Sequence, residues 1–259
     1  MNGTMPPEPS RVARTGLRIA HLYPDLLDLY GDRGNVLVLR RRAEWRGIPV
    51  DVDRIGIGDP YRQQDYDLVF LGGGQDQAQR FLRDDLLSRR DELARAIGRG
   101  CVFLCICGGY QMMGAYYLDA EGNTLEGLGL LDVRTEAGAT RFIGNTAYRC
   151  DLLGNGPDAV IYAFENHAGR TRLGPGATPL ARVLRGAGNN GEDGTEGLRY
   201  RNVFASYGHG SLLPKNPALA DWLLALALNP ESGTAADLAP LSDLLERSAR
   251  DACARRLSL

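Results

Sequence analysis

Apolar residues in the first half of the chain occur in short runs that alternate with longer amphipathic segments. The β-rich runs are residues 17–23, 50–57, 67–71 and 101–106. The last two are continuously apolar, which is typical of strands buried on both faces of a parallel sheet. Helical spacing is found in residues 35–45 and 79–97, and a further helix is expected from Gly108 to about residue 118. This alternation predicts an α/β fold with a mostly parallel central sheet and helices on both faces.

The second half contains shorter β-type segments separated by Gly, Asn, Asp and Pro. These strand candidates are residues 128–133, 146–152, 160–164, 180–184 and 202–207. We expect antiparallel strands that extend the sheet, with a mobile hairpin loop at residues 186–197. A helix is predicted at residues 217–228, with Pro217 near its first turn. Leucines at helical spacing predict a terminal amphipathic helix over residues 234–257.

Three units follow from this pattern: a disordered leader (1–15), an α/β domain (16–230) and a C-terminal helical extension (231–259). The leader contains three prolines and no apolar core, so it is not a signal peptide and a cytoplasmic location is expected. A net charge of -2 gives no electrostatic case for nucleic acid or an anionic membrane. The uncharged run at residues 101–118 is interrupted by Gly and Gln, which favours a strand followed by a helix over membrane insertion.

The cysteines are the first candidates for a catalytic or metal-binding role. The chain has five cysteines and only three histidines. No C-x-x-C pair is present, so neither a metal site nor a disulfide framework is expected. Cys107 follows an apolar strand and precedes Gly108 and Gly109, an arrangement that predicts a nucleophile elbow at a helix N-terminus. There the helix dipole favours the thiolate and the Gly108 N–H can hold an oxyanion. The alternative is a buried core cysteine, which is our interpretation of Cys101 and Cys105.

A thiol nucleophile needs a base, and three histidines are available. His21 lies inside the first predicted strand and suits a structural role. His167 follows a strand and could face the same crevice. His209 stands between Gly208 and Gly210 after an apolar strand, and these glycines allow the ring to turn toward the crevice. We favour His209 over His167.

These motifs resemble class I glutamine amidotransferases in the order glycine loop, nucleophile and histidine. The segments that carry the resemblance are residues 72–74, 107–111 and 208–210. Residues 21–25, 29–35, 71–77, 140–145 and 164–167 are similar to the cobyric acid synthase-like branch, and closest to the glutaminase subunits of lipid II isoglutaminyl synthases. The resemblance covers roughly residues 17–228 and implies that Cys107 forms a γ-glutamyl thioester while His209 moves the protons.

The resemblance also implies binding roles. Gly73 or Gly74 would join Gly108 in the oxyanion hole, and Arg141 would bind the glutamine carboxylate. Gln111 would line the glutamine pocket, although its place on the helix after the elbow also suits plain packing.

One departure from the class I pattern concerns the third catalytic residue. Many members carry His-x-Glu, whereas here the sequence is His209-Gly210-Ser211. Glu165, Asp25 and Asp32 are the alternatives within the chain. Our hypothesis is an acid supplied by the partner, which would keep glutamine hydrolysis low until the complex forms.

The chain has no phosphate loop, so activation of an acceptor requires a synthetase in trans. The resemblance implies a Mur-ligase-like partner, MurT, that would bind ATP and Mg, with no cofactor in this chain. Together they would amidate the α-carboxylate of D-glutamate in lipid II to D-isoglutamine during peptidoglycan synthesis. The alternatives are an amidotransferase for another acceptor, such as a corrinoid acid, and a non-catalytic regulatory protein of the same fold.

Overall fold

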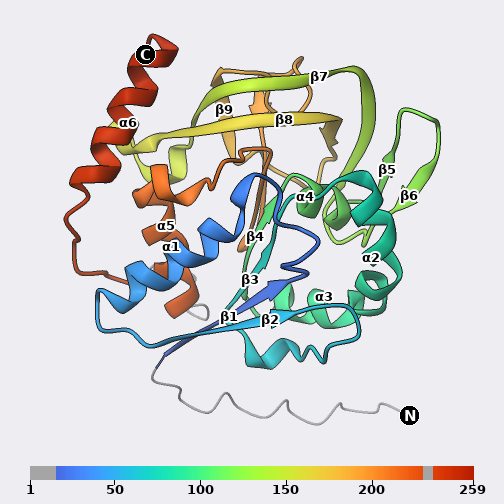
Figure 1. Ribbon diagram of the computed structural model, residues 1–259, viewed down its shortest axis with the longest axis horizontal. Coiled ribbons are helices and arrows are strands. Elements are labelled where there is room, and N and C mark those ends of the chain that lie inside the picture. Colours follow the sequence, from blue (N-terminus) through green and yellow to red (C-terminus); the bar gives the residue numbers. More distant parts are fainter. Residues whose placement is uncertain (1–15, 230–235) are drawn as a thin grey trace.

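The computed structural model describes residues 16–229 and 236–259, and its centre is a six-stranded sheet in the order β11-β12-β4-β3-β1-β2 (Figure 1). Its strands are β1 (Leu17–Leu22), β2 (Val50–Ile55), β3 (Leu68–Leu71), β4 (Val102–Ile106), β11 (Leu198–Tyr200) and β12 (Val203–Ser206). All neighbours pair in parallel except β11, which is antiparallel to β12. Every residue of β3, β4 and β12 is buried, as expected for strands covered on both faces.

Helices cover both faces of this sheet. Figure 1 shows α1 (Arg33–Glu44) and α5 (Pro217–Leu228) on one side, and α2 (Asp76–Ser88) and α3 (Arg90–Gly98) on the other. Helix α5 is apolar around nearly its whole circumference, which suits a helix buried between α1 and the sheet. The predicted α/β fold is confirmed, and the helix at residues 217–228 has the predicted bounds.

The antiparallel strands form a second sheet instead of extending the first. It contains β5 (Tyr116–Leu118), β6 (Thr124–Glu126), β7 (Val133–Arg149), β8 (Val160–Leu173), β9 (Ala181–Arg185) and β10 (Thr195–Glu196). The strand predicted at residues 202–207 corresponds to β12, which joins the first sheet in parallel, and the antiparallel edge strand β11 was not predicted. The long β7–β8 hairpin shifts register between Ala137 and Phe142. Residues of β8 alternate between buried and partly exposed, so one face of the hairpin is available to cover the functional site.

Two predicted helices are shorter in the structure. The helix expected over residues 79–97 is divided at Arg89, whose buried side chain turns back to Asp85 and to the carbonyl of Gly56. The helix after the elbow, α4 (Gly108–Met113), stops before Gly114. A Cβ at Gly114 would lie 2.6 Å from Cγ2 of Val133, so the close approach of the Val133 side chain ends the helix. The strand expected at residues 128–133 is a loop up to Val133.

The glycine-rich segment 186–197 is anchored by buried residues near both of its ends, whereas residues 191–194 at its tip are exposed. Asn189 and Asn190 are buried within it. Asn189 Nδ2 donates to the carbonyl of Gly197 at 2.9 Å, and Asn190 Nδ2 donates to that of Thr171 at 3.1 Å. These amide side chains thus tie the segment to backbone carbonyls at Gly197 and in β8.

The terminal helix α6 (Leu244–Leu257) is shorter than the predicted range of residues 234–257, and residues 236–243 are not helical. Leu244 and Leu245 are exposed instead of packing inward. The helix is held by buried Arg250, which donates to the carbonyls of Pro157 and Val160 at 2.8 Å. The predicted leader and the proposed boundary at residue 230 lie outside the described residues. Within the described ranges no helix is long and apolar enough to cross a bilayer.

Helix α1 is tied to α5 and to the segment before α6 by a buried arginine. The Arg42 side chain is only 2% exposed, and its guanidinium lies 2.6 Å from a carboxylate oxygen of Asp221 and 2.6 Å from one of Asp243. Arg46 adds a second contact to Asp221 at 2.7 Å. The two carboxylates are therefore paired with two buried arginines, Arg42 and Arg46, from a distant part of the chain.

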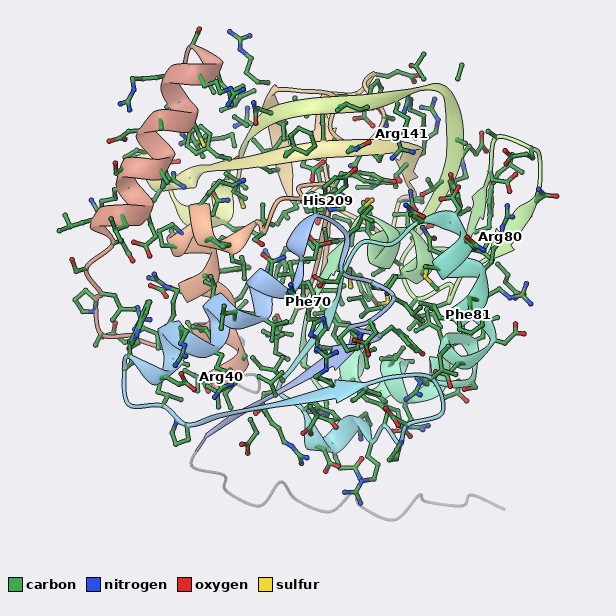
Figure 2. The ribbon with its side chains drawn as sticks, in the orientation of Figure 1. Arg40, Phe70, Arg80, Phe81, Arg141 and His209 are labelled. Atoms are coloured by element: carbon green, nitrogen blue, oxygen red, sulfur yellow. The ribbon has the colours of Figure 1, made fainter. Side chains whose placement is uncertain are left out.

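We expect Arg42→Ala to lower the free energy of unfolding by about 3 kcal/mol, because both carboxylates lose a buried partner. Urea denaturation measures this change. Arg40, also on α1 and paired with Glu44, is the matched control (Figure 2). Its pair is exposed, so Arg40→Ala should cost about 0.5 kcal/mol. Equal effects of the two variants would contradict the prediction.

Candidate active site

The loops after four parallel strands meet at one edge of the sheet. Asp32 comes from the segment after β1, Gly73 from the loop after β3, Cys107 from the end of β4 and His209 from the loop after β12. Parallel strands bring their carboxyl ends to the same edge, which is where such sheets bind ligands. In Figure 2, His209 lies beyond the labelled Phe70 of β3, at this edge.

Cys107 occupies the predicted elbow between β4 and α4. Its φ of +48° and ψ of −102° are strained for a residue with a side chain. The turn is held because Cys107 N–H donates to the carbonyl of Ser206 at 2.9 Å and Gly109 N–H donates to that of Gly72 at 3.1 Å. Cys107 is 6% exposed, yet it lines a cleft of about 580 Å³, whereas Cys105 is enclosed in the core. Cys107 is thus packed against the core and also lines the cleft, and its place in the cleft favours the nucleophile interpretation.

Asp32 stands where the third catalytic residue is needed. Its Oδ2 lies 3.5 Å from Nδ1 of His209, and both side chains are fully buried. That distance is an ion-pair contact, longer than a strong hydrogen bond, and such contacts tighten when substrate binds. The same oxygen accepts the N–H of Gly73 at 2.7 Å.

The other candidates for this role lie elsewhere. Glu165 accepts the backbone N–H groups of Ala187 and Gly188, and Asp25 is exposed and paired with Arg54. The chain thus places its own acid, Asp32, beside the histidine.

The electrostatic partners of His209 favour its charged form. Burial lowers the pKa of this imidazole, but the thiolate of Cys107 and the carboxylate of Asp32 outweigh burial and raise that pKa to about 10. The Cys107 sulfur and the Asp32 carboxylate therefore both favour the imidazolium form of His209. A thiolate paired with an imidazolium is the form in which cysteine attacks a carbonyl carbon.

Our expectation for the oxyanion glycines is corrected at one position. The N–H of Gly73 is already used by Asp32. Gly74 lines the cleft, and its nitrogen would lie 2.9 Å from a Cβ built on Gly108. Gly74 and Gly108 therefore face each other beside Cys107, and their N–H groups are the ones suited to an oxyanion.

The cleft carries opposite charges on its walls. Its lining residues are Leu29, Tyr30, Gly74, Gln75, Asp76, Gln77, Gln79, Cys107, Gln111, Tyr117, Arg141, Asn166, His167 and Ala168. Arg141 projects from β7 (Figure 2), and Asn166 orients it by accepting from Nε and Nη2 at 3.0 Å through its side-chain and backbone oxygens. Asp76 lies in the first turn of α2 and accepts from Tyr117 Oη at 3.4 Å. We did not predict Asp76 as a site residue, since an acid in a first helical turn is common for helix-dipole reasons alone.

Gln111 lines the cleft and also packs within it. Its Oε1 accepts from Gln79 at 3.0 Å, and its Nε2 donates to Tyr207 Oη at 3.3 Å. Gln111 therefore both lines the cleft and packs against its neighbours, as the two interpretations of the sequence suggested.

The two other histidines are buried and neutral. Burial lowers the pKa of His21 to about 4 and that of His167 to about 3. His21 packs against Phe70, in agreement with its predicted structural role. An imidazole whose pKa is about 3 is too weak a base to activate a thiol at neutral pH, so the choice of His209 over His167 is supported. No cluster of metal ligands is found in the described part of the chain.

We expect Cys107→Ala to lower the pKa of His209, because the thiolate that raises this pKa is removed while burial still opposes the charge. Histidine NMR titration of the full chain measures the shift. Cys253→Ala is the control, since this half-exposed cysteine lies on α6. An unchanged pKa in Cys107→Ala would show that the thiolate is not the cause.

Comparison with known proteins agrees with this geometry. Residues 18–217 match the CobB/CobQ-like glutamine amidotransferase domain. The chain is 40% identical over 232 residues to the lipid II isoglutaminyl synthase (glutamine-hydrolyzing) subunit GatD of Streptococcus pneumoniae, covering 89% of this chain and 88% of that protein. It is 41% identical over 211 residues to the GatD subunit of Staphylococcus aureus, covering 82% and 84%.

More distant matches agree in fold. A cobyric acid synthase of Pelotomaculum thermopropionicum is 33% identical over 163 residues, covering 56% of this chain and 29% of that enzyme. A glutamine amidotransferase structure from Thermotoga maritima superposes with a TM-score of 0.53 at 15% identity, covering 95% of this chain and 93% of that one. This chain belongs to the CobB/CobQ-like glutamine amidotransferase family.

Proposed function

We propose that this chain is the glutaminase subunit of a lipid II isoglutaminyl synthase. The observation that carries the proposal is the buried set of Cys107, His209 and Asp32, in which Cys107 lines a cleft with opposite charges on its walls. The similarity to two GatD subunits over most of both chains supports the same assignment.

The residues account for each step of glutamine hydrolysis. The Cys107 thiolate attacks the side-chain amide carbon, and the N–H groups of Gly74 and Gly108 stabilise the oxyanion. The C–N bond then breaks, and the imidazolium of His209 gives its proton to the departing nitrogen, so ammonia and a γ-glutamyl thioester result. The neutral imidazole next takes a proton from water, which attacks the thioester and releases glutamate. Asp32 stabilises the imidazolium each time it forms.

The cleft walls suit a free amino acid. Arg141 presents a planar guanidinium that matches the α-carboxylate, and Asp76 presents a carboxylate that matches the α-ammonium group. A zwitterion satisfies both charges at once, whereas a peptide-bound glutamine lacks both groups.

The ammonia requires an acceptor on another subunit. The sequence has no phosphate loop, so we propose a Mur-ligase-like ATP-dependent partner, MurT, that holds ATP and Mg and activates the D-glutamate carboxylate of lipid II. This reaction would take place in the cytoplasm. A corrinoid acid is the alternative acceptor, but the chain spans less than a third of the matching cobyric acid synthase, compared with most of either GatD subunit.

We expect Cys107→Ala to abolish glutamine-dependent amidation by the complex while added ammonia still supports it, because only the source of ammonia is lost. Mass analysis of the lipid-linked product measures both activities. The wild-type complex supplied with ammonia is the control. Loss of both activities would contradict a purely glutaminase role for this subunit.

We expect Asp32→Asn to lower kcat for glutamine hydrolysis by about 10²- to 10⁴-fold, since an amide neither stabilises the imidazolium nor holds the correct tautomer. Asp28→Asn is the matched control, because Asp28 lies in the same loop and contacts Arg33 instead. Release of ammonia by the complex gives the rates. A near-normal rate in Asp32→Asn would restore the case for an acid from the partner.

A further inference from the structure

His167 holds a rigid position in the wall of the cleft and has no role in the steps above. It projects from β8, and its ring stacks on Tyr207 with 3.7 Å between centroids and 10° between planes. The ring of Phe142 meets it edge-on, with centroids 5.6 Å apart. Only 2% of His167 is exposed, yet it lines the same cleft as Cys107. The ring is therefore held in one orientation by Tyr207 and Phe142.

The two ring nitrogens of His167 differ in their environment. Nδ1 lies 2.8 Å from the carbonyl oxygen of Gly169, which can only accept, so Nδ1 carries the hydrogen. Nε2 is then a bare lone pair, and it has no partner among the described residues. Burial and the nearby cations Arg170 and Arg141, together with His209, oppose protonation. His167 is therefore a fixed, neutral acceptor, and a buried acceptor without a partner is uncommon.

The reacting end of glutamine supplies what this acceptor lacks. A carboxamide has two N–H donors, whereas the carboxylate of the product glutamate has none. We propose that Nε2 of His167 accepts a hydrogen bond from the substrate's amide nitrogen as that nitrogen leaves the carbon. This assignment rests on the proposed glutaminase function and adds to it a residue that recognises the leaving group.

The contribution of this hydrogen bond grows along the reaction. After the Cys107 sulfur–carbon bond forms, the nitrogen takes a proton from His209 and carries positive charge until the C–N bond breaks and neutral ammonia leaves. Its N–H groups become stronger donors, so the bond to Nε2 strengthens in the transition state. His167 gains no proton in this step. After ammonia departs, the lone pair faces the carboxylate of glutamate unfavourably, which favours product release.

Two substitutions separate the roles of the two ring nitrogens. His167→Asn places an amide near Nδ1 and leaves nothing at Nε2, whereas the longer side chain of His167→Gln can place its oxygen near Nε2. The substrates to compare are glutamine and the γ-methyl ester of glutamate, whose leaving oxygen carries no hydrogen to donate. The readout is kcat/KM, which reports formation of the thioester, for the full chain with its synthetase partner.

We expect His167→Asn to lower kcat/KM for glutamine by about tenfold and to change that for the ester within about twofold. His167→Gln should recover part of the loss. An equal loss on both substrates, or no loss on either, would overturn the assignment and leave His167 a packing residue. Failure of the wild-type protein to hydrolyse either substrate would instead refute the proposed function.

A second measurement does not depend on the folding of His167 variants. In ¹⁵N-histidine-labelled Cys107→Ala protein, saturating glutamine should move the Nε2 resonance of His167 upfield, as acceptance of a hydrogen bond does, and glutamate should not. An Nε2 resonance that does not respond to glutamine would overturn the proposal.

Discussion

The contact between the Asp32 carboxylate and the His209 imidazolium holds the functional edge of this protein together. Both side chains are fully buried, so each would be an uncompensated polar group without the other. The Gly73 N–H binds the same carboxylate oxygen and brings the loop after β3 to the pair. A hydrogen bond of 2.6 Å from Ser211 Oγ to the carbonyl of Gly31 adds a second contact between the segment that holds Asp32 and the segment that holds His209. One ion pair thus aligns loops that are far apart in the sequence.

This close approach explains why two glycines are required. A Cβ at Gly73 would lie 2.5 Å from Cε1 of His209, and one at Gly109 would lie 2.7 Å from the carbonyl oxygen of Leu71. Any side chain at Gly73 would separate the imidazole from its carboxylate. A side chain at Gly109 would push α4 away from β3 and relax the strained turn at Cys107. The geometry of the nucleophile therefore depends on the absence of side chains at Gly73 and Gly109 as well as on the reacting groups.

The parts of the site that the sequence predicts are those set by local chemistry. The apolar run of β4 followed by two glycines predicts the elbow at Cys107, because a strand and a tight turn need only their own residues. Asp32 remained one of several candidates, since its role depends on a loop about 180 residues away. The second sheet was missed for a similar reason. Strands β7 and β8 are long, and their alternation of buried and exposed residues is explained only by the tertiary structure, in which one face of the hairpin covers the cleft. The leucines at helical spacing predicted a longer packed helix, but Leu244 and Leu245 are exposed in the part of the chain that the structure describes.

The three histidines show how far residue type alone can determine function. All are nearly or fully buried, and burial lowers the pKa of each. His21 and His167 have no adjacent anion to offset that effect fully and remain neutral. His209 alone lies between a thiolate and a carboxylate, and its pKa rises to about 10. Charge suits the residue that must give a proton, and neutrality suits one that must only accept a hydrogen bond. Because the anions come from other loops, the fold, and not the local sequence, decides which imidazole can act as the acid.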